Sequence, residues 1–212
     1  MNHTPFFAPW IHCLAPLGAR TPQAVARVRA CTLCQLEACF GKWLPQDLFP
    51  KACQKANSRD RHYTRWRTFW CSLWQNLSPQ ASCREVVRQL QALFKLEGGP
   101  QISEEDGDYC RAKARLPLAQ FPKALAATAE FCDQSVPALD FLKGRPVKVV
   151  DGSALTLLAD TKKNRAAYPP LQCQPNQPSF PMMRFVVLFS LLSGAILAAA
   201  QGSLAVSELS LL

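Results

Sequence analysis

The chain has 212 residues, of which 49% are hydrophobic and 18% are charged, and its formal net charge is +9. This composition is too apolar and too weakly charged for an intrinsically disordered protein, and the length allows one good-sized domain or two small ones. The excess of basic side chains favours a polyanionic partner, such as a nucleic acid, or a membrane surface, and it says nothing about the fold.

The first 20 residues are predicted to form an irregular tail, without the basic start and continuous apolar stretch of a signal peptide. Without export, the ten cysteines are expected to stay reduced. Cys31, Cys34 and Cys39 have the spacing closest to that of zinc ligands. A structural zinc site needs four ligands, however, and no second Cys-x-x-Cys pair occurs, so buried thiols on a helix are the favoured interpretation.

Residues 21–136 are predicted to form a mostly helical domain that binds DNA. Thr21-Pro22 is typical of a helix start. Another helix opens with Ser82 and Glu85, which have the spacing of a capping box, and Gly98-Gly99-Pro100 ends it. The remaining helices are predicted over residues 68–77, over 104–115, and from Pro117 to about Phe131.

Residues 51–67 are strongly basic, with six Lys and Arg side chains against one acidic residue, and with Tyr63 and Trp66 between them. Lys and Arg contact phosphates and aromatic rings stack on sugars or bases, so this segment is a candidate nucleic-acid surface. A solvated basic loop before a helix has the same pattern, and both interpretations stay open. The candidate DNA-binding residues here are Arg59, Arg61, Arg65 and Arg67.

Residues 144–160 have the β-branched alternation of a strand, and Asp151 is followed at once by Gly152. Asp151 is either part of an Asp-Gly turn or a metal ligand held on the strand. A loop rich in Pro, Gln and Asn is predicted over 166–181.

The segment from Phe185 to Ser207 contains no charge, so a transmembrane helix has to be considered. Ser193-Gly194 lies midway, however, where it favours a tight turn between two buried strands. The hairpin is the preferred prediction, with a helix beginning near Ser207-Glu208. The expected fold class is α+β, in which a helical region precedes the first three strands of a ribonuclease-H-like domain over residues 137–212.

Several segments, in this order, resemble the DDE transposases of bacterial insertion sequences, in particular the insertion-sequence-four branch. They are residues 58–91, residues 103–118, residues 149–169 and the chain from Ser179 onward.

The resemblance implies phosphodiester hydrolysis and strand transfer by two divalent metal ions, held by two Asp and one Glu. Asp151 matches the first catalytic Asp and is the expected Mg²⁺ ligand, with Gly152 allowing close approach of the backbone. Arg111 and Arg115 match the family's segment around Tyr109 and extend the candidate DNA-binding surface. The resemblance further implies transposon terminal repeats as partners, a homodimer in the DNA complex, no membrane, and a cytoplasmic, nucleoid-associated location.

The second Asp and the Glu of the family are missing from the sequence, because only Asp160 and Glu208 are acidic beyond Asp151. Asp160 is expected in a loop or turn. Glu208 is expected either to cap a helix or to approach the metal. A truncated transposase that is inactive alone and binds Mg²⁺ weakly is therefore the leading hypothesis. The alternatives are a non-catalytic DNA-binding fragment that recognises transposon ends, and a small membrane-anchored protein.

Overall fold

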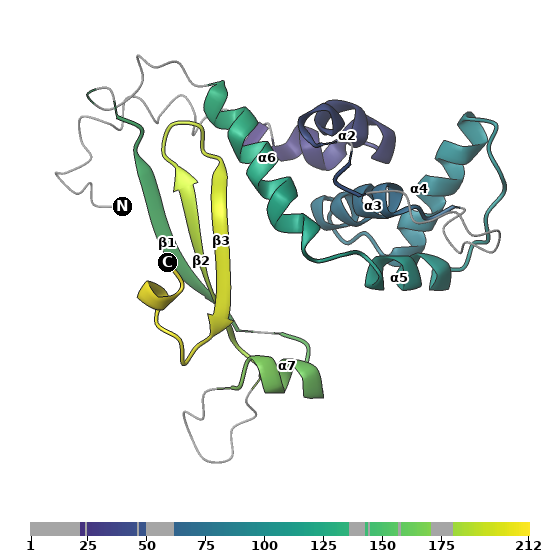
Figure 1. The fold of residues 1–212 in the computed structure, drawn as a ribbon. Helices are drawn as coiled ribbons and strands as arrows, with labels where there is room; N and C mark the ends of the chain where they lie inside the picture. Colours follow the sequence, from purple (N-terminus) through teal and green to yellow (C-terminus); the bar gives the residue numbers. More distant parts are fainter. Residues whose placement is uncertain are drawn as a thin grey trace. The chain divides into compact units, whose positions relative to one another are not determined.

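Figure 1 shows the chain in a computed structural model, which contains a set of helices and a three-stranded antiparallel sheet. The predicted α+β class and the three predicted strands are confirmed. The tail predicted over 1–20, and Arg59 and Arg61, lie outside the described residues. The structure describes residues 22–23, 25–45, 47–49, 62–135, 143, 145–156, 158–170 and 180–212.

The chain divides into two compact units. The helical unit holds α2 (Leu33–Phe40), α3 (Arg65–Leu77), α4 (Cys83–Leu96) and α5 (Gly107–Ala114). The sheet unit holds α6 (Gln120–Gln134), β1 (Lys148–Leu155), α7 (Lys162–Ala167), β2 (Met183–Ser190), β3 (Ile196–Ser203) and η3 (Glu208–Ser210).

Local sequence signals set the ends of the helices in the helical unit. Ser82 accepts a hydrogen bond from the Glu85 backbone at the start of α4, as predicted. The reciprocal half of that capping box is not formed, because the Glu85 carboxylate accepts hydrogen bonds from Arg88 and Gln89 instead. A complete capping box starts α2, where Thr32 and Gln35 bond reciprocally.

The core of the helical unit is built from the apolar faces of these helices. Trp70 of α3 is 1% exposed and contacts Phe69 and Trp66 edge to face. Tyr109 of α5 has no exposed surface, and its ring lies 6.1 Å from that of Tyr63. The other fully buried aliphatic residues are Leu36, Val86, Val87 and Leu90.

In the sheet unit β2 lies between β1 and β3, and both neighbours run antiparallel to it. The uncharged segment therefore forms a hairpin, as predicted, and its turn includes Gly194 at a φ of +68°. No helix within the described residues is both long enough and apolar enough to cross a membrane.

Helix α6 runs beside β3 in the sheet unit (Figure 1). Near its end, Asp133 accepts a hydrogen bond of 2.6 Å from the hydroxyl of Ser193 in the β2–β3 turn. The same hydroxyl accepts a hydrogen bond from the backbone N–H of Ala195. These two bonds attach the helix to the turn and hold the turn in shape.

Two short elements differ from the sequence prediction. The helix predicted at Ser207-Glu208 is a single 3₁₀ turn, η3, with Ser207 as its N-cap. The segment around Asp160, expected to be a loop, leads into α7, a helix of six residues with Thr161 as its N-cap.

Truncation of Leu90 tests the core of the helical unit. Leu90 has no exposed surface, so Leu90→Ala leaves a cavity and is expected to lower the free energy of unfolding by about 2–5 kcal/mol. Leu96 lies in the same helix but is 87% exposed, so Leu96→Ala is expected to change stability by less than about 0.5 kcal/mol. Urea unfolding followed by tryptophan fluorescence measures both, and equal effects would contradict the packing described.

Candidate functional site

Asp151 lies in the middle of β1, directly opposite Val187 of β2. The strand continues through Gly152 to Leu155, so the Asp-Gly turn is excluded. The Asp151 side chain is exposed, and no hydrogen bond or ion pair joins its carboxylate to another described residue. Its oxygens are therefore available to a metal ion or to solvent.

Glu208 approaches β1 from the other face of the sheet. A Cβ atom placed on Gly152 would lie 2.5 Å from the Glu208 carboxyl carbon, so the Glu208 carboxylate occupies the space toward which a side chain at position 152 would point. Successive side chains of a strand point to opposite faces. Asp151 and Glu208 therefore lie on opposite faces of β1, and the two carboxylates do not converge on one ion.

Arg184 of β2 holds Glu208 in this position. Its guanidinium donates a hydrogen bond of 2.8 Å to the Val206 carbonyl and lies 3.9 Å from a Glu208 carboxylate oxygen. Arg184 pairs with Ala154 in the β1–β2 register, which places it on the same face as Gly152. Glu208 thus has a structural partner in the sheet, and Ser207 provides the cap of η3.

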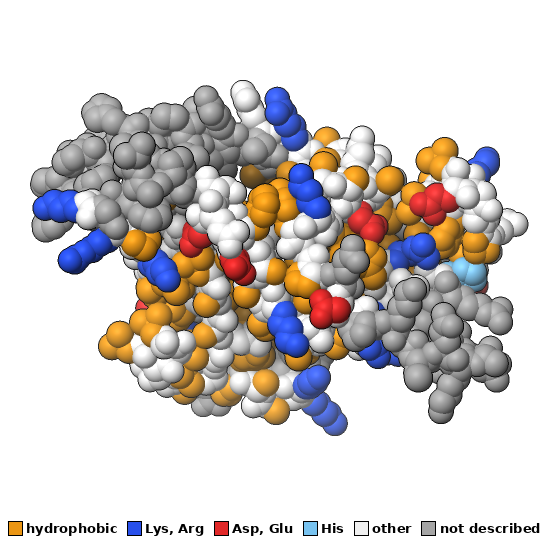
Figure 2. Space-filling model, turned by 45° about the horizontal axis from the view of Figure 1, so that its top comes forward, with side chains coloured by type: hydrophobic (Ala, Val, Ile, Leu, Met, Phe, Trp, Pro, Cys, Tyr) orange, Lys and Arg blue, Asp and Glu red, His pale blue; other side chains and the backbone are white. Residues whose placement is uncertain are grey.

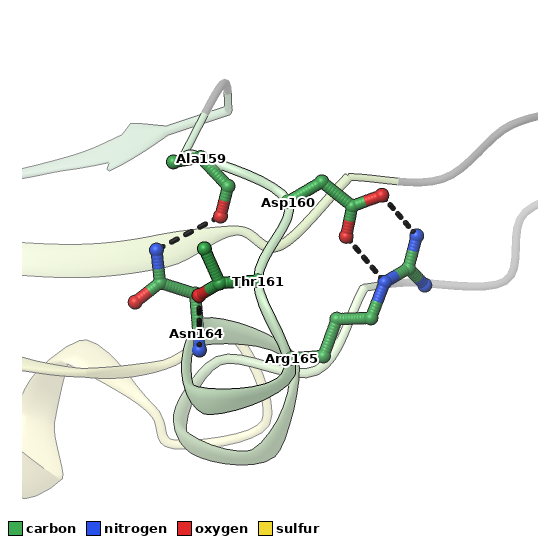
Figure 3. A network of polar contacts seen from close by, with 5 residues as sticks. All are labelled: Ala159, Asp160, Thr161, Asn164 and Arg165. Carbon is green, nitrogen blue, oxygen red and sulfur yellow. Dashed lines mark hydrogen bonds and ion pairs between the residues drawn. The ribbon is translucent and has the colours of Figure 1, made fainter.

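Asp160 is also paired with an arginine, as Figure 3 shows. Its two carboxylate oxygens accept hydrogen bonds of 2.5 and 2.8 Å from Arg165 of α7. These bonds lower the pKa of the Asp160 carboxyl. In the same network Asn164 donates to the Ala159 carbonyl, so Asp160 belongs to the start of a helix.

The basic candidates of the helical unit differ in their contacts. Arg65 is half-buried at the first position of α3, and no hydrogen bond or ion pair joins its side chain to another described residue. Arg111 of α5 pairs with Asp108 at 2.6 Å while 68% of its side chain stays exposed. Arg115 is exposed at the end of α5. The ring contact between Tyr63 and Tyr109 brings the start of α3 close to α5, so these arginines belong to neighbouring elements.

Arg67 is used inside the helical unit. Its guanidinium donates a hydrogen bond of 3.0 Å to the His62 carbonyl and lies 4.7 Å from the centre of the Phe94 ring. These contacts make Arg67 a structural residue that links the start of α3 to α4.

On the face shown in Figure 2, Lys and Arg side chains are dispersed among hydrophobic and acidic ones.

The thiols are distributed differently from the sequence prediction. Cys34 and Cys39 lie on α2 as expected, but they are exposed. Among the cysteines that the structure describes, Cys71 is the buried one, and burial raises the pKa of its thiol to about 12. Burial also raises the pKa of Tyr63 to about 12. Both groups are therefore held in their neutral form inside the helical unit.

One group of metal-ligating side chains comes together away from Asp151. Cys83, Asp106 and Cys110 each offer a ligand atom, and these atoms all lie within 4.8 Å of one another. Sequence reasoning missed this group, because Cys83 stands far along the chain from the other two and no short spacing marks it. Asp106 and Cys110, which are four residues apart on one helix face, were the only local signal.

Comparison of the chain with models of known protein families, with curated protein sequences and with solved structures finds no match. A function is therefore inferred from the residues and their geometry.

A double-mutant cycle tests the position of Glu208. Gly152→Ala is expected to displace the Glu208 carboxylate and weaken its pairing with Arg184, at a cost of about 0.5–1 kcal/mol. In a Glu208→Ala background the same substitution meets no carboxylate, so the cost is expected to disappear. Thermal unfolding of the four proteins measures the coupling, and strictly additive effects would contradict the placement of η3.

Alkaline pH tests the buried Cys71 and Tyr63. The unfolded chain loses these protons near their ordinary pKa values of 9.0 and 10.0, whereas the folded chain keeps them to about 12. The contribution of these two groups to the free energy of unfolding is therefore fully present below about pH 8 and declines as the pH rises toward 12. Cys71 alone accounts for about 1 kcal/mol of the loss between about pH 8 and 10.

Urea midpoints measured across this range should fall with pH, and the fall should be shallower for Cys71→Ala. The slope is the readout, since the substitution itself also shifts the midpoint at every pH. A wild-type urea midpoint that does not change with pH would contradict the raised pKa values of Cys71 and Tyr63.

Proposed function

We propose that this chain is a DNA-transposition protein of the DDE transposase lineage, in which the helical unit binds DNA and Asp151 is the first catalytic acid. The observation that carries the proposal is the exposed carboxylate of Asp151 in the middle of β1, which makes no hydrogen bond or ion pair with any other residue that the structure describes. It lies on the first strand of an antiparallel β1–β2–β3 sheet that follows a helical unit in the sequence. A ribonuclease-H-like catalytic domain would begin with this order.

Asp151 fits a magnesium ion as one oxygen ligand. Mg²⁺ takes oxygen ligands in octahedral geometry and keeps several waters, so a single carboxylate binds it weakly. When bound, a two-metal centre activates the attacking oxygen and stabilises the leaving oxygen. Asp151 would hold one ion at its carboxylate, on the face of β1 away from Glu208.

The 212-residue chain is proposed to be catalytically silent by itself. Beyond Asp151 its two acidic residues, Asp160 and Glu208, are each paired with an arginine, and Glu208 lies on the opposite face of β1. A DNA-binding module without catalysis is the second candidate function, and these two ion pairs favour it. In both cases the proposed partners are the terminal repeats of a mobile DNA element and a second copy of the chain, at the nucleoid.

DNA binding by the helical unit is supported by three arginines whose side chains reach solvent. These are Arg65, Arg111 and Arg115. The Arg111–Asp108 pair is exposed, so it contributes little to stability and a phosphate can replace Asp108 as the partner. Arg59 and Arg61 lie outside the described residues and stay predictions.

Fluorescence anisotropy with labelled duplexes tests the DNA-binding part. The duplexes are the DNA ends that flank the coding sequence and a shuffled duplex of equal length. The full chain should bind the flanking ends more tightly, and affinity should fall steeply with salt. Arg65→Ala should weaken binding and reduce the salt slope by about 1 without changing stability.

Arg67→Ala is the matched comparison, two residues along the same helix. It should lower stability by about 1–2 kcal/mol, because it removes the contacts with His62 and Phe94. Absence of DNA binding by the folded chain would overturn the proposal. Equal binding to flanking and shuffled ends would overturn recognition of transposon ends.

A plasmid-nicking assay tests the catalytic part. The purified chain should not nick supercoiled plasmid in Mg²⁺ or Mn²⁺, and Asp151→Asn should behave in the same way. Metal-dependent nicking that is lost in Asp151→Asn would contradict the silence of the isolated chain and establish Asp151 as catalytic.

A further inference from the structure

The starts of α4 and α5 bring two thiols and a carboxylate together. Cys83 is the first residue of α4, Asp106 immediately precedes α5, and Cys110 lies one turn along α5. Their ligand atoms all lie within 4.8 Å of one another. Among the residues that the structure describes, they are the one set of three His, Cys, Asp or Glu side chains that meets this condition.

Each of the three side chains is available for a ligand. Both cysteines are free thiols, Cys83 half-buried and Cys110 exposed. Asp106 occupies the N-cap position of α5, where an Asp side chain usually accepts a backbone hydrogen bond, but its carboxylate makes no such bond. It is instead close to the two sulfur atoms.

We propose that Cys83, Asp106 and Cys110 form a zinc site, with two thiolates and one carboxylate as protein ligands and solvent in the fourth position. Zinc binds sulfur at about 2.3 Å in tetrahedral geometry, which separates two sulfur ligands by about 3.8 Å. Atoms that already lie within 4.8 Å need only a small movement to reach this separation. Thiolate ligands select zinc over magnesium, which prefers oxygen, so this site differs in kind from the one proposed at Asp151.

A hydrogen bond from Gln75 orients Cys83. The Gln75 amide nitrogen lies 3.5 Å from the Cys83 sulfur and 3.2 Å from the Ala81 carbonyl oxygen, and it donates to both. Its direction is fixed, because the amide oxygen accepts hydrogen bonds of 2.9 Å from Tyr109 and from Lys113. An N–H group directed at a thiolate is the kind of outer contact that orients a metal ligand and tunes its affinity.

Lys113 also balances the charge of the site. Two thiolates and a carboxylate around Zn²⁺ leave a net charge of −1, and one ammonium group neutralises it. Lys113 stands three residues after Cys110 on α5, and its ammonium group donates a hydrogen bond of 2.9 Å to the Gln75 amide whose nitrogen donates to Cys83. The positive charge is therefore held beside the ligands of the proposed site.

Zinc at this site would join α4 to α5 at their first turns. Metal that binds only the folded chain stabilises it by mass action, so zinc should raise the melting temperature of the helical unit. The prediction is independent of Asp151 and of DNA cleavage, because all three ligands lie outside the sheet unit.

The test is metal binding to the reduced, metal-free full chain. Titration with Co²⁺, a spectroscopic substitute for Zn²⁺, should give one ion per chain, with thiolate-to-metal charge-transfer bands and the visible bands of a tetrahedral centre. Zinc should displace the cobalt and raise the melting temperature. Cys110→Ser should weaken zinc binding at least about tenfold and remove the thermal shift, and because Cys110 is exposed this variant should fold normally.

Two matched controls keep the result specific. Asp106→Asn should weaken binding, whereas Asp108→Asn, on the same helix but outside the group, should not. Cys34→Ser, at an exposed thiol of α2, should also leave binding unchanged.

Two results would overturn the proposal. The first is the absence of stoichiometric metal binding by the reduced wild-type chain; if air-exposed protein then forms a Cys83–Cys110 disulfide, the thiols serve as a redox pair instead. The second is metal binding that survives both Cys110→Ser and Asp106→Asn.

Discussion

The helical unit depends on the side chain of Gln75 in α3, which satisfies polar groups of α5, of α4 and of the segment between α3 and α4 at once. Its oxygen accepts from Tyr109 and Lys113 of α5, and its nitrogen donates to the Ala81 carbonyl and to Cys83 at the start of α4. Tyr109 has no exposed surface, so its hydroxyl requires a partner, and leaving it without one would cost about 1–3 kcal/mol. The contact that places α5 in the core therefore also places Cys110, the next residue, beside Cys83.

The sheet unit is governed by the two-residue period of a strand. This period places Asp151 on one face of β1 and the space occupied by Glu208 on the other. Arg184, on the Glu208 face, fixes η3 there through Val206 and Glu208 itself. The Asp151 carboxylate is therefore exposed and makes no hydrogen bond or ion pair with another described residue, while Asp160 and Glu208, which follow it in the chain, are paired with arginines.

The two units thus offer different ligands. The sheet presents a single carboxylate, which suits a hard cation that is held mainly by other groups. The helical unit presents two sulfurs and a carboxylate, which suit zinc. Arg65 and Arg111 add positive charge to the helical unit. They lie on α3 and α5, which the contact between Tyr63 and Tyr109 brings together. Both proposals for this part of the chain, DNA binding through the arginines and a zinc ion at Cys83, Asp106 and Cys110, therefore use separate sets of side chains.

Local chemistry was sufficient for much of the fold. Ser82 marks the start of α4 and Gly98-Gly99-Pro100 marks its end, because a hydroxyl cap and a pair of glycines act within one turn of the helix. Ser193-Gly194 favoured a hairpin of two strands over a single membrane-spanning helix, because glycine permits the left-handed φ that the turn requires. The strand that carries Asp151 was equally predictable from its β-branched residues. The short helix α7 was missed, although its N-cap Thr161 accepts a hydrogen bond from Asn164 only three residues along the chain.

The sequence by itself determined where the three strands and the longer helices lie, that the class is α+β, and that Asp151 stands on the first strand. Only the tertiary structure decided that Arg67 contacts Phe94, that Glu208 lies on the face away from Asp151, and that Cys83 meets Asp106 and Cys110. Caps, turns and periodicity act between residues a few positions apart, so they can be read along the chain. Contacts between distant residues depend on how complete elements pack, and no local spacing encodes them.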